Sequence, residues 1–469
     1  MPVFNKEHLN LARRAASEGM VLLKNDNETL PLVKENGIAL FGRNQLEVFK
    51  GGGGAADLWA VPYVSFADAL EKTGNVYQPM LRKYRAYFEA NRNNALNKIQ
   101  YKCTWSLPEV PLKDQEVEAA AAACDTAVVF IGRYASESMD IKDVAGEYRI
   151  TGGENAMIAK VTKYFKKTVL VLNLPGMMDM LFLGDYNFDA ILQVYMPGME
   201  AGNALCDVLY GDVTPSGKLP DSWAKRNYEY PTNETFSTEK VVYSEGIYMG
   251  YRYFDTFKKD VLFPFGYGLS YTDFSYETVD FNIQKTVVTI NVKVTNTGKY
   301  SGRETVQCYL SVPDGEMEQP YQVLCGFEKT KLLKPQESET LSIKTDLLDF
   351  TTYSEKRAEY LLEKGRYILR VGSHSRSTKP VCAVEIDETV VCRKVKNRLM
   401  PKEEIGELKK ESFTVEEITD IPVLKAYFDG LKLRCHLKDL KYANLLRENL
   451  AVLKMCFRGR ELPKTWWHC

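Results

Sequence analysis

One short segment carries the two carboxylates that are best placed to do chemistry. It covers residues 132–140, reads GRYASESMD and directly follows the apolar run 127–132. In α/β proteins ligands bind just beyond the carboxyl ends of the sheet strands. If the run is such a strand, Glu137 and Asp140 lie where chemistry takes place. On this pattern alone, an exposed acidic loop without a catalytic role is the commoner alternative.

Other kinds of catalytic site find little support in the sequence. The chain has no Gly-x-Ser-x-Gly motif, and its four histidines include no pair at the spacing of metal ligands on a helix. Its ten cysteines form no Cys-x-x-Cys pair. The glycines at 51–54 are followed by AADL, which fits neither a phosphate loop nor a dinucleotide fingerprint. We therefore predict no metal ion and no cofactor, and we interpret the glycines as a flexible or tightly turned loop.

Composition excludes several classes of partner. The chain has 61 Lys and Arg against 62 Asp and Glu, so its net charge of −1 lacks the basic field of a nucleic-acid binder. An apolar run of about 20 residues, as needed to span a bilayer, is missing. The first 20 residues lack the apolar centre of a signal peptide. These features predict a cytoplasmic protein with no nucleic-acid or membrane partner.

The elements that position the carboxylates follow from the pattern of apolar residues. Short runs that are apolar on both faces recur, and helix-like stretches such as 116–124 and 155–166 lie between them; the runs cover residues 37–42, 127–132, 169–174 and 190–194. Buried strands that alternate with helices predict an α/β fold with a mostly parallel sheet covered by helices, over residues 1 to about 275.

The pattern changes twice further along the chain. From about 276 to 378 apolar residues alternate with polar ones, as at Val288, Ile290, Val292 and Val294. Roughly 100 residues of short alternating strands predict a β-sandwich. From 379 to 469 helical spacing dominates, for example between Leu437 and Leu453, which predicts a largely helical extension.

Several motifs, in order along the chain, resemble those of glycoside hydrolase family 3, the β-glucosidase and β-xylosidase group. They are EGMVLLKN at 18–25 with LPL at 30–32, PGMEAG at 197–202, GDVTPSGKLP at 211–220, EGIYMGYRYF at 245–254, FPFGYGLSYT at 263–272, VTNTG at 294–298 and GRETVQ at 302–307. The resemblance implies an α/β-sandwich domain of that family at 1–275 and a fibronectin type III-like domain at 276–378. Residues 379–469 would then be a linker and helical extension, a remnant of a barrel start.

The resemblance also assigns roles to the two carboxylates. In the family, a loop resembling S-x-E-x-x-D-R supplies the general acid/base, so Glu137 aligns with the catalytic glutamic acid and Asp140 with an aspartate that we expect to contact substrate. The chain departs from this motif, since Ser138 replaces a usual glycine and Ile141 a usual arginine. Both departures bear on how the loop is anchored.

The family's nucleophile does not have a counterpart in this sequence. It is an aspartate in an S-D-W-like strand end of a (β/α)8 barrel, and the chain contains no Ser-Asp-Trp. Some family members have a permuted order of α/β domain, sandwich and barrel, and this chain resembles that order without the barrel. A retaining glycosidase needs two carboxyl groups about 5–5.5 Å apart. The resemblance thus implies that the second comes from a barrel that is either missing from this sequence or carried by a separate chain.

Two functions remain open at this point. The first is β-glucosidase-like, retaining hydrolysis of O-glycosidic bonds of a β-glucoside or related oligosaccharide, with Glu137 as acid/base and the nucleophile expected from a missing or separate barrel. The second is a catalytically inactive carbohydrate-binding or scaffold protein that retains the fold. An assay on an aryl β-glucoside, with and without a barrel-bearing chain, distinguishes them.

Overall fold

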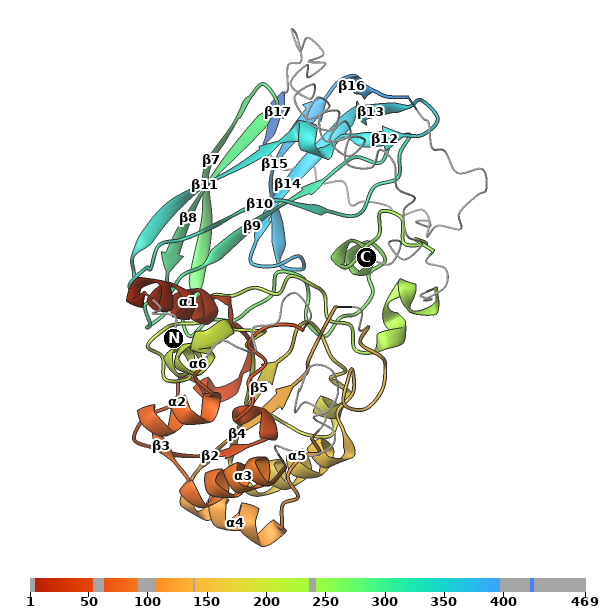
Figure 1. Ribbon diagram of the computed structural model, residues 1–469. Coiled ribbons are helices and arrows are strands. Elements are labelled where there is room, and N and C mark those ends of the chain that lie inside the picture. Colours follow the sequence, from red (N-terminus) through yellow and green to blue (C-terminus); the bar gives the residue numbers. More distant parts are fainter. Residues whose placement is uncertain are drawn as a thin grey trace, which may run out of the picture.

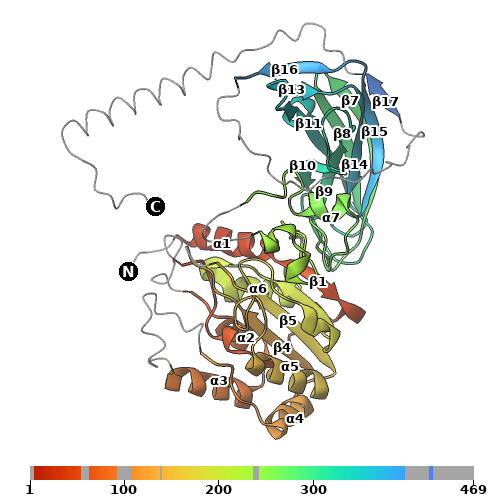
Figure 2. The same ribbon diagram turned by 90° about the vertical axis from the view of Figure 1, so that its right-hand side faces the viewer.

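The computed structural model describes residues 5–53, 63–91, 107–137, 140–235, 242–396 and 422–425. Figure 1 shows a helix-covered sheet below and a group of β-sheets above it, and Figure 2 shows the same two parts from the side. The strands of the first part are β1 (Val21–Asn25), β2 (Gly37–Phe41), β3 (Asn75–Val76), β4 (Thr126–Gly132), β5 (Lys167–Asn173) and β6 (Ala190–Gln193). Its helices are α1 (Lys6–Gly19), α2 (Phe66–Thr73), α3 (Gln78–Asn91), α4 (Asp114–Ala123), α5 (Gly152–Tyr164), α6 (Ala201–Leu209) and α7 (Tyr251–Thr256).

The strands of the first part form a six-stranded sheet in the order β1-β6-β5-β4-β2-β3. Strands β2 to β6 run parallel, and β1 pairs antiparallel with β6 at one edge. The four apolar runs of the sequence are strands β2, β4, β5 and β6, so the predicted mostly parallel sheet is confirmed. All seven residues of β4 are buried, as expected of a strand covered on both faces.

Helices cover both faces of this sheet. Leu70 of α2 and Leu205 of α6 pack with one set of alternating strand residues, which includes Val128. Val117 of α4 and Ile158 of α5 pack with the other set. The predicted stretches 116–124 and 155–166 correspond to α4 and α5. The predicted helical cover is therefore confirmed.

The second part is built mainly from antiparallel strands. They are β7 (Phe274–Gln284), β8 (Val287–Asn296), β9 (Thr305–Ser311), β10 (Val323–Lys329), β11 (Ser338–Asp346), β12 (Thr352–Ser354), β13 (Glu359–Leu362), β14 (Gly365–Gly372), β15 (Thr378–Ile386), β16 (Val390–Lys394) and β17 (Val423–Lys425). The sheets have the orders β10-β9-β14-β15-β17, β11-β8-β7 and β12-β13-β16, with β15 and β17 as the parallel pair. The alternating valines and isoleucine at 288–294 are buried between the sheets, which confirms the predicted all-β part.

The strands continue beyond residue 378, where the sequence pattern placed the end of the sandwich. Strands β15 and β16 occupy 378–386 and 390–394, and β17 at 423–425 pairs with β15. The helical spacing predicted between Leu437 and Leu453 lies outside the described residues. None of the described helices is long and apolar enough to cross a membrane.

Buried polar contacts join the two parts. Gln307 of β9 donates from Nε2 to the carbonyl oxygens of Gly266, at 2.9 Å, and Ser373, at 2.7 Å. Lys218 forms an ion pair of 3.0 Å with Glu304, and their side chains are 13% and 7% exposed. The sandwich is thus fixed to the α/β part by pairs that water reaches poorly.

His374 lies at this junction, between the turn after β14 and the end of the α/β part. Its ring contacts the Tyr267 ring edge-on at 5.5 Å between centroids. Burial, followed by the charges of Lys218 and Arg376, lowers the pKa of His374 to about 4. An unfolded chain would protonate this imidazole below about pH 6.5. The contribution of His374 to stability is therefore complete near pH 7 and is lost as the pH falls from about 6.5 toward 4.

We expect His374→Gln to reduce the acid sensitivity of the fold. The melting temperature of the parent should fall more between pH 7 and pH 5 than that of the variant, by about 1 °C for each 1 kcal/mol of linkage, because an unfolding entropy of about 2.1 cal/mol/K per residue sums over both parts. Calorimetry at pH 7, 6 and 5 measures this difference. The matched control is His8→Gln, at an exposed position on α1, which should track the parent. Equal falls in the parent and in His374→Gln would contradict the prediction.

Candidate functional site

The order of strands places a topological switch point at the carboxyl edge of the sheet. Strands β2 and β4 are neighbours in the centre, but β2 leads to β3 on one side and β4 leads to β5 on the other. The loops that follow β2 and β4 therefore diverge, and such a switch point is where open α/β sheets bind ligands. The loop after β4 carries both carboxylates selected from the sequence.

Glu137 and Asp140 both lie exposed on this loop, and Ser138 and Met139 between them are outside the described residues. The backbone just before Glu137 is held by the loop after β2. The Gly53 N–H donates to the Ala135 carbonyl at 2.8 Å, and Gly53 and Ser136 form a parallel bridge. The structure thus presents the Glu137 carboxyl to solvent from a backbone that a neighbouring loop supports.

Gly53 permits this close approach because it has no side chain. A Cβ at this position would lie 2.0 Å from Tyr134 Oη and 2.5 Å from Ser136 Oγ. Gly53 of the glycine run therefore lies against the carboxylate-bearing loop, and Gly54 is outside the described residues. The closeness of the two loops depends on glycine at position 53.

We expect Gly53→Ala to lower the free energy of unfolding by about 1–3 kcal/mol, because the added methyl must displace Tyr134 and Ser136. Urea denaturation measures this change. Gly176→Ala is the matched control, since a Cβ there meets nothing within 4 Å. Equal effects of the two substitutions would show that the contact with Tyr134 and Ser136 is not what restricts position 53.

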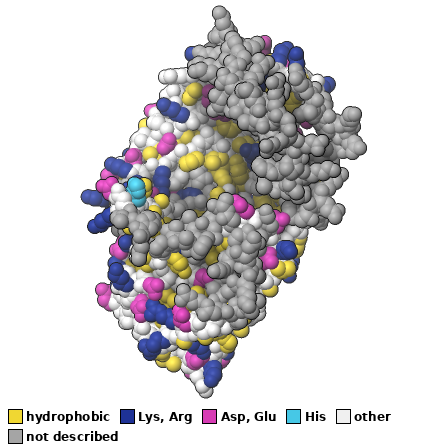
Figure 3. Space-filling view, viewed as in Figure 1, with side chains coloured by type: hydrophobic (Ala, Val, Ile, Leu, Met, Phe, Trp, Pro, Cys, Tyr) yellow, Lys and Arg dark blue, Asp and Glu magenta, His cyan; other side chains and the backbone are white. Residues whose placement is uncertain are grey.

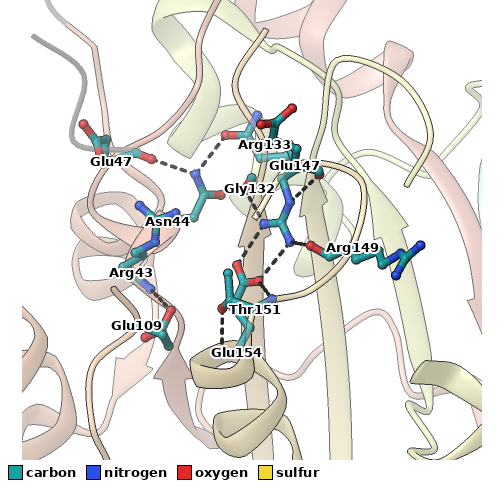
Figure 4. A network of polar contacts seen from close by, with 11 residues as sticks. Arg43, Asn44, Glu47, Glu109, Gly132, Arg133, Glu147, Arg149, Thr151 and Glu154 are labelled. Carbon is teal, nitrogen blue, oxygen red and sulfur yellow. Dashed lines mark hydrogen bonds and ion pairs between the residues drawn. The ribbon is translucent and has the colours of Figure 1, made fainter. Parts of the chain in front are cut away.

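A buried ion pair lies beneath the loop. Arg133, the first residue after β4, pairs with Glu154 of α5 through two hydrogen bonds of 2.8 and 2.9 Å (Figure 4). Both side chains are 4% exposed. Burial acts to raise the pKa of Glu154, but the charge and hydrogen bonds of Arg133 outweigh it, so the pKa lies below its ordinary value.

Glu154 also begins the helix that follows the loop. The Thr151 hydroxyl accepts from the Glu154 N–H at 3.1 Å, and Glu154 Oε2 accepts from the Thr151 N–H at 2.8 Å. This reciprocal capping box satisfies two N–H groups at the start of α5. The same carboxylate therefore joins the end of β4 to the start of α5.

A second buried carboxylate lies close to this network. Glu109 accepts a hydrogen bond from the backbone N–H of Arg43 at 3.1 Å (Figure 4) and one from the backbone N–H of Val110 at 2.8 Å. Its burial raises its pKa despite these two bonds. No group of three or more His, Cys, Asp or Glu residues that could hold a metal ion occurs among the described residues.

Asn173 connects three of the loops at this edge. It is fully buried at the end of β5, and its Oδ1 accepts from the Phe49 N–H at 2.7 Å and from Asn44 Nδ2 at 3.2 Å. Its Nδ2 donates to the carbonyl oxygens of Phe49, at 2.9 Å, and Tyr195. One carboxamide thereby fixes the loops after β2, β5 and β6.

Sequence reasoning missed the roles of Arg133, Glu154, Asn173 and Gly53. A usable signal exists for two of them: Arg133 directly follows the apolar run of β4, and Asn173 is a polar residue within the run of β5. Polar residues where buried strands end are candidates for supporting a site at the carboxyl edge. The partners of these two residues come from other parts of the chain and are visible in the structure alone.

Comparisons with known proteins agree with the fold just described. Residues 20–271 match the glycosyl hydrolase family 3 C-terminal domain, and residues 304–375 match a fibronectin type III-like domain. The chain is 39% identical over 404 residues to a β-glucosidase of Ruminococcus albus, covering 84% of this chain and 42% of that protein. It is 34% identical over 451 residues to β-glucosidase A of Butyrivibrio fibrisolvens, covering 85% and 53%. The chain thus spans about half the length of the curated relatives it matches.

Two solved structures have the same arrangement. A β-glucosidase from Paenibacillus barengoltzii superposes with a TM-score of 0.82 at 34% identity, over 86% of this chain and 46% of that one. β-Glucosidase 3B from Thermotoga neapolitana, in complex with α-D-glucose, gives a TM-score of 0.78 at 34% identity, over 82% and 55%.

Proposed function

The chain belongs to the glycosyl hydrolase family 3 C-terminal domain family, and from this membership we propose that it carries the acid/base of a retaining β-glucosidase-like hydrolase. The acid/base is Glu137, and Asp140 on the same loop contacts the sugar. The observation that carries the proposal is the exposed Glu137 on the loop after β4, beside the switch point of the sheet.

The chemistry requires a second carboxyl group. In a retaining glycosidase one carboxylic acid protonates the leaving oxygen, while a carboxylate about 5–5.5 Å away attacks the anomeric carbon. Glu137 takes the first role and afterwards removes a proton from the attacking water. The nucleophile is an aspartate of a (β/α)8 barrel, contributed by a separate barrel-bearing polypeptide.

Apolar side chains around the loop support docking of such a polypeptide. Val144 is 46% exposed, Leu181 48% and Tyr228 61%. Their segments adjoin, because Asn227 Nδ2 donates to Asp143 Oδ2 at 3.5 Å and the Asp179 N–H donates to the Tyr148 carbonyl at 2.9 Å. Figure 3 shows hydrophobic side chains exposed at several places on the side of the molecule that Figure 1 draws. Exposed apolar groups that lie together are typical of interaction surfaces.

The test is turnover of an aryl β-glucoside by the purified chain, alone and mixed with a barrel-bearing polypeptide encoded in the same genome. We expect no turnover by the chain alone and turnover by the mixture. Turnover by the chain alone would overturn the proposal that the nucleophile comes from elsewhere. Absence of turnover in the mixture, together with binding of glucose measured by calorimetry, would favour a non-catalytic carbohydrate-binding or scaffold protein.

That alternative has one observation in its favour. The loop that carries Glu137 departs from the family's usual motif at Ser138 and Ile141. A protein whose loop no longer held its carboxylate for catalysis would keep the fold without the activity. The mixing experiment distinguishes the two functions because the catalytic one gives product.

A further inference from the structure

We propose that Arg133 is the positioning residue of the acid/base loop: its guanidinium holds both ends of the segment that carries Glu137. The inference rests on the proposed role of Glu137 as acid/base. Arg133 itself is buried beneath the loop and acts through the backbone, so it does not touch the sugar.

The guanidinium of Arg133 makes hydrogen bonds beyond its ion pair with Glu154. In addition to its two bonds to Glu154, Arg133 donates from Nε to the Glu147 carbonyl at 2.8 Å and from Nη2 to the Arg149 carbonyl at 2.9 Å. A further bond of 2.8 Å runs from Nη1 to the Gly132 carbonyl (Figure 4). A guanidinium has five N–H donors in a rigid planar fork. Here the fork is fully used, three of its bonds going to main-chain carbonyls of the loop and its root.

These carbonyls lie at the two ends of the loop that carries Glu137. Gly132 is the last residue of β4, and Glu147 and Arg149 lie where the loop returns to α5. The segment between Gly132 and Glu147, which includes Glu137, therefore begins and ends at carbonyl groups that the Arg133 side chain binds. The positions of both ends of this segment are set by one guanidinium.

The end of the loop that leads back to α5, residues 142–149, is itself compact. Within residues 142–149, the Lys142 N–H donates to Glu147 Oε2 at 2.8 Å and the Arg149 N–H donates to the Val144 carbonyl at 3.0 Å. Asp143 and Arg149 add an ion pair of 2.6 Å. Arg133 thus binds to a turn that is already held together by its own hydrogen bonds and ion pair. Together with the contact of Gly53 with Ala135, this supports the carboxylate-bearing segment on both sides.

The substitution Arg133→Lys keeps the positive charge but removes the planar set of five N–H donors. The lysine ammonium can remain beside Glu154, so the buried carboxylate keeps a counter-charge. A single nitrogen at the end of a flexible stem cannot also reach the carbonyls of Gly132, Glu147 and Arg149 in the same geometry. Arg133→Lys is therefore expected to fold while loosening the loop.

The first experiment tests the clamp with the full chain alone. Hydrogen exchange should become faster in peptides that cover residues 134–149 in Arg133→Lys. Arg370→Lys is the matched control, because Arg370 is buried to a similar degree, 5% against 4% exposed, in strand β14 of the sandwich. It should leave these peptides unchanged. Unaltered exchange at 134–149 in Arg133→Lys would overturn the inference.

The second experiment tests the link to Glu137 in the barrel-complemented protein, with a double-mutant cycle. Arg133→Lys should lower kcat on an aryl glucoside with a poor leaving group by about 10- to 100-fold, the cost of a misplaced catalytic group. In a Glu137→Gln background the same substitution should change kcat by less than about twofold, since the group it positions is already disabled. The alkaline limb of the pH–rate profile should move in Arg133→Lys and not in Arg370→Lys.

The outcomes separate the inference from the proposed function. If Glu137→Gln slows the reaction but Arg133→Lys slows both backgrounds equally, Arg133 acts independently of Glu137 and the inference is overturned while the proposed function stands. If Glu137→Gln has no effect on turnover, the proposed function is overturned, and the inference with it. Strong non-additivity together with faster exchange supports the inference.

Discussion

Glu137→Gln is expected to lower kcat/KM by about 10²- to 10⁴-fold on β-glucosides with poor leaving groups, which is the usual contribution of a general acid/base. Glutamine keeps the size of the side chain but has no proton of suitable acidity to donate to the leaving oxygen. The dinitrophenolate of a dinitrophenyl glucoside departs without being protonated. The first step, in which the glycosyl-enzyme forms, should therefore be slowed far less on this substrate. The measurement is kcat/KM on both substrates for the barrel-complemented protein, because kcat/KM reports the first step and not the later attack of water.

Asp140→Asn is the matched control for this prediction. It changes an exposed carboxylate on the same loop, and as a substrate contact it should raise KM without altering the dependence of rate on leaving group. Equal losses on the two substrates in Glu137→Gln would contradict an acid/base role. So would a steeper leaving-group dependence in Asp140→Asn than in Glu137→Gln.

Arg133→Met is expected to have the largest effect on stability, lowering the free energy of unfolding by about 3–5 kcal/mol at pH 7. The substitution leaves the Glu154 carboxylate 4% exposed and without its counter-charge. It also removes the donor to the carbonyls of Glu147 and Arg149. Urea denaturation measures the loss. Lys166→Met is the surface control, because that lysine and Asp125 form a pair 82% and 73% exposed, and removing it should cost less than about 1 kcal/mol.

The loss caused by Arg133→Met should depend on pH in a defined direction. In the parent, the lowered pKa of Glu154 contributes stability above the unfolded pKa of about 4.3, and this contribution is lost as the pH falls through the folded value. Without the charge and hydrogen bonds of Arg133, burial is the largest remaining influence on Glu154, ahead of the Thr151 N–H and the charge of Arg43. We therefore expect its pKa to rise, so that protonation relieves the cost of the buried charge. The gap between parent and variant should therefore narrow from pH 7 toward pH 4.5. A constant gap would show that the lost carbonyl contacts, and not the charge, account for the effect.

The sequence was sufficient for the architecture because each element is determined by a local pattern. Runs that are apolar on both faces require a covered parallel sheet, as found in β4. Alternation at 288–294 requires one buried and one open face, as found in β8. Loop placement follows from strand placement, so the exposed position of Glu137 beyond β4 could also be predicted.

The support of the site could not be predicted in the same way. Asn44 and Asn173 are 129 residues apart, and they meet because β2 and β5 flank β4 in the sheet. Strand order of this kind is decided by packing of the whole domain and leaves no local mark. Arg133 and Glu154 are 21 residues apart on elements that were each predicted, but their pairing depends on how α5 lies against the sheet. Glu109 likewise reads as an ordinary surface acid, although it is 6% exposed.

The junction at Gln307 has a consequence for how the molecule melts. Separating the sandwich from the α/β part would break the hydrogen bond from Gln307 to the Gly266 carbonyl and the ion pair of Lys218 with Glu304. A neutral hydrogen bond contributes about 0.5–1.5 kcal/mol net and one to a charged group about 1.5–3 kcal/mol. Each part is therefore stabilised by the other, and a calorimetric scan should record one cooperative endotherm for both. The stability of the β-sandwich is therefore linked to that of the α/β part, which carries the loop with Glu137.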